Sequence, residues 1–110
     1  MNQEIHLKIL RVLEKTPEIT QRELAQHLGV SLGKINYCLK ALKEKGLVKW
    51  SHFSSNPNKK QYLHLLTTKG IVAKIELTSH FLMRKQAEYD DLRREIKALA
   101  AELGQDGNEG

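Results

Sequence analysis

The sequence predicts a mainly α-helical fold with one small β-hairpin, an α+β architecture that ends in one long C-terminal helix. Apolar residues first recur at helical spacing in three short segments between residues 4 and 46. Two β-rich runs then enclose a turn-forming stretch at 54–60. A seven-residue apolar repeat follows and continues to residue 103. We therefore expect a compact domain over 1–67, a long helix over 68–103 and a disordered tail over 104–110.

Two short helices open the compact domain. The first is predicted by an apolar face that ends before Pro17, because proline disfavours helix in the residue before it. The second begins at Thr20, which with Glu23 makes a capping box that satisfies free amides at a helix start. It runs to about Leu28, and Gly29 then supplies the positive φ of a tight exit.

A third helix is predicted from the N-cap Ser31 to Gly46. Its apolar residues share one face, and they are Leu32, Ile35, Leu39 and Leu42. If this face meets the core, the outward and flanking positions are Gly33, Lys34, Asn36, Tyr37, Lys40, Ala41 and Glu44. Free amides at the helix start, beside Ser31, are suited to a phosphate.

The β-rich runs, Leu47–Phe53 and Gln61–Leu66, are predicted to form a hairpin with a basic tip. Imperfect alternation leaves open which side chains face inward. The tip contains Asn58, Lys59 and Lys60, which can lie along a nucleic-acid backbone. Residues 34–60 contain seven lysines and one acid, Glu44, so the positive field belongs to the N-terminal part of the chain.

The long helix has a heptad seam, made of Ile71, Ile75, Thr78, Leu82, Lys85, Tyr89, Leu92, Ile96, Leu99 and Leu103. At about 50 Å the helix is longer than the domain that precedes it, so its distal half needs a partner. We expect residues 71–82 to pack within their own domain. A homodimer interface is predicted at Leu82, Lys85, Tyr89, Leu92, Ile96, Leu99 and Leu103. Its orientation stays open, although Glu88 would face Arg93 in a parallel pair.

Several stretches resemble the MarR-type winged helix-turn-helix regulators, and in particular the short members associated with extracellular polysaccharide genes. They are residues 19–31, 34–42, Glu44–Val48 and Leu66–Gly70. The resemblance covers about residues 4–103 and implies a third helix that reads DNA through Gly33, Lys34, Asn36, Tyr37 and Lys40. Larger members carry further dimerisation helices that often frame a ligand pocket. The resemblance therefore assigns dimerisation to the last helix and leaves a small-molecule effector unassigned.

Other kinds of chemistry find little support in the sequence. Neither a nucleophile with a base nor a phosphate-binding glycine loop is present, so we expect no enzyme activity, no cofactor and no metal. The five histidines are scattered and are expected at the surface, although His52 and His64 could meet across the hairpin. Cys38 is expected to be a half-buried, inert thiol. No secretory leader or membrane span is recognisable, so we expect a cytoplasmic protein.

Two functions remain after these exclusions. The first is sequence-specific binding of double-stranded DNA by a homodimer that regulates transcription, including that of exopolysaccharide genes. In the second, the protein is a winged-helix adaptor that docks another protein through its coiled coil without reading DNA. The two differ in salt response, because phosphate binding weakens steeply as salt rises.

Overall fold

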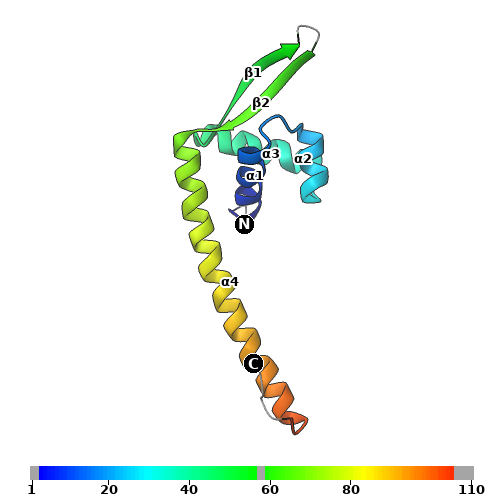
Figure 1. Cartoon of the computed structure of the whole chain (residues 1–110), viewed down its shortest axis with the longest axis vertical. Coiled ribbons are helices and arrows are strands. Elements are labelled where there is room, and N and C mark those ends of the chain that lie inside the picture. The colour runs from blue at the N-terminus through cyan, green and yellow to red at the C-terminus, as the bar shows by residue number, and fades with distance from the viewer. Residues whose placement is uncertain (1–2, 57–58, 106–110) are drawn as a thin grey trace. The chain divides into compact units, whose positions relative to one another are not determined.

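The computed structural model describes the backbone of residues 3–56 and 59–105 and the side chains of 3–51 and 63–105. Figure 1 traces the elements in chain order: α1 (Gln3–Lys15), α2 (Gln21–Leu28), α3 (Leu32–Glu44), β1 (Val48–Asn56), β2 (Lys59–Leu66) and α4 (Thr68–Glu102). The predicted fold class, mainly helical with one hairpin and a long C-terminal helix, is confirmed.

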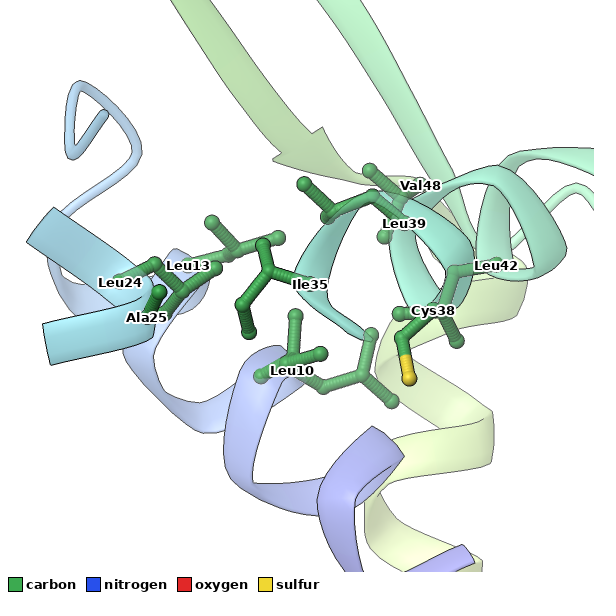
Figure 2. Close-up of a cluster of buried hydrophobic side chains, with 10 residues drawn as sticks. Leu10, Leu13, Leu24, Ala25, Ile35, Cys38, Leu39, Leu42 and Val48 are labelled. Atoms are coloured by element: carbon green, nitrogen blue, oxygen red, sulfur yellow. The ribbon is translucent and has the colours of Figure 1, made fainter. Parts of the chain in front are cut away.

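The core is an apolar cluster that joins α1, α2 and α3 to the start of β1 (Figure 2). Its buried members are Ile9, Leu10, Leu13, Leu24, Ala25, Ile35, Cys38, Leu39, Leu42 and Val48. Removing such side chains from water is the main stabilising term of a small domain. The cluster therefore holds α3 by one face only.

Two predictions about that face are wrong. Leu32 was expected to point inward but is 37% exposed, because it is the first residue of α3 and the buried row begins one turn later, at Ile35. Cys38 was expected to be half-buried and is fully buried. Its position, three residues after Ile35 and one before Leu39, places it on the inner face of the helix.

The predicted capping box at the start of α2 is confirmed. The Thr20 amide donates to Glu23 Oε1 at 2.9 Å, and the Glu23 amide donates to Thr20 Oγ1 at 3.0 Å. At the other end of α2, Gly29 has φ +69° and the Val30 amide donates to the Ala25 carbonyl at 3.0 Å. This left-handed residue turns the chain sharply into α3.

The hairpin is longer than predicted. The strands pair antiparallel with Val48 opposite Leu66 and Trp50 opposite His64, and the register becomes irregular between Phe53 and Asn56. Residues 54–56, 59 and 60, which we assigned to the turn, belong to the strands. Composition favoured a turn there, but cross-strand pairing outweighs local propensity. At the base of the hairpin, the His64 amide donates to the Pro17 carbonyl at 2.9 Å, which ties β2 to the loop before α2.

The junction between the hairpin and α4 depends on Thr67 and Gly70. The Thr67 hydroxyl donates to the Gly46 carbonyl at 2.6 Å and accepts from the Gly70 amide at 3.0 Å. A Cβ at Gly70 would overlap the carbonyl oxygen of Leu47. Glycine at this position therefore lets the first turn of α4 approach the backbone closely.

The N-terminal compact unit extends to Thr78, beyond the boundary at 67 that the sequence predicted. Within this unit, Leu77 packs against the core and Lys74 pairs with Glu14 of α1. The second unit begins at Ser79. Of the predicted tail, the structure describes Gly104, which ends the helix at φ +73°, and Gln105, while residues 106–110 lie outside the described part.

The expectation that residues 71–82 pack within their own domain is wrong for the seam itself. Ile71 and Ile75 are 42% and 60% exposed, because Leu77, on an adjacent face of α4, makes the contact with the core. The apolar seam is thus uncovered from its first residue. No helix in the described part of the chain is long and apolar enough to cross a membrane.

Candidate nucleic-acid interface

The N-terminus of α3 is exposed and is capped by Ser31. Ser31 has extended backbone angles, and its Oγ accepts a hydrogen bond from the Lys34 amide at 3.1 Å. This bond satisfies one of the free amides at the helix start, while the others still point out of the helix end. The start of α3 therefore offers backbone donors next to the Lys34 side chain.

The two faces of α3 have opposite characters. Ile35, Cys38, Leu39 and Leu42 are buried, as the core requires. The six positions that the sequence proposes for DNA contact are all exposed, and they are Ser31, Gly33, Lys34, Asn36, Tyr37 and Lys40. Ala41, also assigned outward, is only partly exposed. The same helix thus packs through one side and leaves its polar side in solvent.

Tyr37 is 65% exposed although it is a large aromatic residue. It lies between Lys34 and Lys40 on the outer face of α3. An exposed aromatic ring flanked by cations can contact a base, a thymine methyl group or a phosphate. Contact with DNA by any of these residues remains a prediction.

The three residues predicted at the hairpin tip lie at the limit of what the structure describes. Asn58 falls outside the described residues, and Lys59 and Lys60 belong to β2 without described side chains. Their contact with a nucleic-acid backbone therefore also stays a prediction.

Sequence reasoning did not single out Trp50 or Lys43. The Lys43 ammonium lies 6.0 Å from the centre of the Trp50 ring, and the ring is 54% exposed. Lys43 follows Asn36 and Lys40 at helical spacing, so the polar row of α3 continues to the base of the hairpin. That spacing was the available signal for Lys43, whereas only the fold brings Trp50 next to it.

Trp50 and Lys43 border an open hollow of about 940 Å³ beside the start of α2. His27 and His64 also line it, together with residues of the loop before α2 and its first turn: Thr16, Glu18, Ile19, Thr20, Gln21 and Glu23. The lining has mixed charge, because it contains basic Lys43 together with acidic Glu18 and Glu23.

The expectation that all histidines lie at the surface is wrong for His6 and His64, which are buried. Burial lowers the pKa of both imidazoles, and the nearby positive charges of Lys45 and Lys43, respectively, lower them further. His64 pairs with Trp50 and His52 with Tyr62, so the two histidines are not direct cross-strand partners. Among the side chains described, no three histidine, cysteine or acidic groups cluster as metal ligands.

Cys38 has little thiolate character. Burial raises the pKa of its thiol, and the positive charge of Lys34 opposes this only in part. Because the thiolate is the reactive form, a buried and protonated Cys38 is chemically quiet. It serves as a small apolar residue of the core.

Parts of this chain are similar to a known protein family and to a named transcriptional regulator. Residues 3–49 match the family described as winged helix-turn-helix DNA-binding. A 53-residue segment is 42% identical to the HTH-type transcriptional regulator Ptr1 of Methanocaldococcus jannaschii. That segment covers 48% of this chain and 36% of the relative, so the chain matches about a third of the relative's length.

Solved structures share the fold at low identity. A MarR-family protein of Mycobacterium tuberculosis, in complex with p-aminosalicylic acid, aligns with a TM-score of 0.64 and 22% identity over 91% of this chain and 77% of its own. A PadR-like transcriptional regulator from Bacillus cereus aligns with a TM-score of 0.71 and 21% identity over 80% and 90%. FabT of Streptococcus pneumoniae, in complex with DNA, aligns with a TM-score of 0.55 and 19% identity over 91% and 74%. The matched family is described by DNA binding, and the relative Ptr1 is described as a transcriptional regulator.

Proposed function

We propose that this protein is a transcriptional regulator that binds specific double-stranded DNA as a homodimer in the cytoplasm. The match of residues 3–49 to the winged helix-turn-helix DNA-binding family and the fold shared with a MarR-family structure support this proposal. The observation that carries the proposal is the outer face of α3. It is polar and exposed, while the opposite face is held by the buried core. A helix held in this way can enter the major groove without unfolding the domain.

The exposed α3 residues that the sequence singled out for DNA contact each have a proposed role. Asn36 pairs with an adenine edge, and Tyr37 stacks on a base or touches a thymine methyl group. Lys34 and Lys40 neutralise phosphates or reach guanine acceptors, while Ser31 and the nearby amides hold a phosphate. Gly33 permits close approach of the backbone. Asn58, Lys59 and Lys60 would lie along the backbone or the minor groove.

The solved structure of FabT with DNA supports this assignment, because a protein of the same fold binds DNA. The exposed α4 seam supports the homodimer, since Leu82, Tyr89, Leu92, Ile96, Leu99 and Leu103 are each more than half exposed in the single chain. On the resemblance of the α3 sequence, we extend the proposal to genes for extracellular polysaccharide. Selecting bound sequences from a random duplex pool identifies the operator. Whether that operator lies beside genes for extracellular polysaccharide then tests the extension.

The test of base reading uses the selected duplex and a scrambled duplex in anisotropy titrations. Asn36→Ala and Tyr37→Ala should weaken binding to the selected duplex by about 5- to 100-fold and leave scrambled binding nearly unchanged. Lys40→Ala should weaken binding to both equally and reduce the salt slope by about one. Lys8→Ala, an exposed lysine of α1, is the matched control and should change neither.

Equal losses on both duplexes for all three α3 variants would contradict base reading. Absence of duplex binding even at low salt would overturn the DNA-binding proposal and favour the protein adaptor.

A further inference from the structure

The seam of α4 has a symmetry that bears on how two copies meet. Its ten positions follow one another in steps of four and three residues, and this order reads the same in both directions about residue 87. Reversing one helix therefore brings every seam position opposite another seam position. We propose that the two copies of α4 pair antiparallel in this register, an inference that rests on the proposed homodimer.

The apolar ends of the seam match each other in this arrangement. Ile71 lies opposite Leu103 of the second copy, and Ile75 lies opposite Leu99. All four are substantially exposed in the single chain, between 42% and 77%, so they are free to take a partner. Leu82 similarly meets Leu92, and both are more than half exposed.

The two polar seam residues decide between the orientations. A parallel, in-register pair sets Lys85 against Lys85 and Thr78 against Thr78, which places two like charges in one layer of the seam. In the antiparallel pair, Lys85 lies opposite Tyr89 and Thr78 opposite Ile96. The aliphatic stem of Lys85 can then cover the Tyr89 ring while its ammonium reaches the edge of the seam.

That edge already holds an acceptor for the lysine. Lys85 Nζ lies 3.2 Å from Glu88 Oε1 of the same chain, and both groups are exposed. The two copies of Glu88 approach each other at the centre of the antiparallel pair, where the two lysines balance their charge. The central layers thus carry no net charge.

Residues that flank the seam contribute to both orientations. Antiparallel pairing sets Val72, which is 49% exposed, against Ala100 of the second copy, so both lose contact with water. Parallel pairing sets Glu88 against Arg93, an exposed ion pair worth about 0.5 kcal/mol. Arg93 already lies over the Tyr89 ring of its own chain, 5.7 Å from the ring centre. Avoiding the Lys85 layer outweighs this one pair.

Spin-label distances in the full-length protein test the orientation. A nitroxide label is attached to the new cysteine in each of two variants, Ala101→Cys and Ala87→Cys. Both positions lie on the outer side of α4, away from the seam. Antiparallel pairing puts the two labels at 101 about 40 Å apart along the coil axis, because each lies 14 residues from the centre. Labels at 87 remain about 20 Å apart, since they stay level in either orientation. The unsubstituted chain is the blank, because Cys38 is buried.

A long distance at 101 with a short one at 87 is the expected result. Short distances at both sites would show a parallel pair and overturn this inference, while the homodimer would stand. Long distances at both sites would overturn the register. No dipolar coupling at either site would mean that the chains do not pair, which removes the homodimer of the proposed function as well.

Discussion

Two glycines in helices, Gly33 and Gly70, have opposite surroundings, so that substitutions there can distinguish an effect on the proposed DNA contact from an effect on stability. Gly33, on the outer face of α3, has only the Ser31 hydroxyl at 4.0 Å from the position of an added Cβ. Gly70, at the start of α4, has the Leu47 carbonyl within overlap distance. A methyl group therefore fits at Gly33 and does not fit at Gly70.

We expect Gly33→Ala to raise the free energy of unfolding by up to about 1 kcal/mol, because alanine favours a helix over glycine. The same change should weaken operator binding, since the added methyl separates the helix from the duplex. Gly70→Ala is the contrast, and it should lower the free energy of unfolding by about 1–3 kcal/mol. Urea unfolding and anisotropy titration measure the two effects. Unchanged operator affinity in Gly33→Ala would contradict close backbone approach at this position.

Buried histidines make the stability of the domain sensitive to acid. The pKa of His6 and of His64 is lowered in the folded chain, chiefly by burial, whereas the unfolded chain keeps the ordinary value of 6.5. As the pH falls through 6.5, the unfolded state takes up protons before the folded state does. The free energy of unfolding should therefore be highest above this pH and decrease until the pH passes the lowered folded-state values.

The variant His6→Leu tests this pH dependence, because His6 Nε2 has no hydrogen-bond partner among the described residues and leucine can occupy its place. Between pH 7.5 and 5.5, the variant should lose less of its unfolding free energy than the unsubstituted chain. Equal losses in urea titrations at the two pH values would show that His6 is not one of the groups responsible.

At the scale of elements, both ends of α2 are delimited by local interactions. The capping box at Thr20 and Glu23 begins α2, and Gly29 ends it with a left-handed turn. These features were predictable, because a cap involves residues only three positions apart. Hydrogen bonding to the backbone and side chain of Thr20 lowers the pKa of Glu23, consistent with a carboxylate that stays ionised in the cap.

Loss of this cap should be measurable. Thr20→Ala should lower the free energy of unfolding by about 1 kcal/mol, because the Glu23 amide loses its acceptor. Gln26→Ala, on the exposed face of the same helix, is the control and should cause no loss, since alanine is a strong helix former. A Thr20→Ala protein as stable as this control would show that other contacts alone hold the start of α2.

For the hairpin and α4, composition and periodicity did not predict the structure fully. Composition predicted a turn at 54–60, whereas pairing continues to Asn56 and Lys59. For α4, the heptad pattern identified the seam but assigned its first part to the wrong neighbour, because Leu77 on another face packs against the core. Periodicity shows which residues share a helix face, but the partner of that face depends on the rest of the fold.

At the scale of the whole molecule, the proposed function depends on two copies acting together. A dimer with two recognition helices binds two half-sites, and linking the two binding events raises the affinity without new contacts. The exposed seam of α4 is the surface available for this purpose.

We expect Leu99→Asp to dissociate the dimer, because it places a charge in the seam. Sedimentation equilibrium should show a monomer at micromolar concentration, and affinity for a duplex with two half-sites should fall at least about tenfold. Ala98→Asp introduces the same charge at the neighbouring exposed position off the seam, and it should leave both measurements unchanged. A Leu99→Asp protein that remains dimeric would place the interface elsewhere.

The sequence by itself determined the helices, the caps at Thr20, Gly29 and Ser31, and which side of α3 is buried from Ile35 onward, because hydrogen bonds between near neighbours and helical periodicity are local properties. It therefore also predicted that Asn36, Tyr37 and Lys40 lie together on an exposed surface. Only the tertiary structure placed Trp50 beside Lys43, buried His6 and His64, and left Ile71 and Ile75 uncovered. These features arise from contacts between segments far apart in the chain, and such contacts depend on how the elements pack.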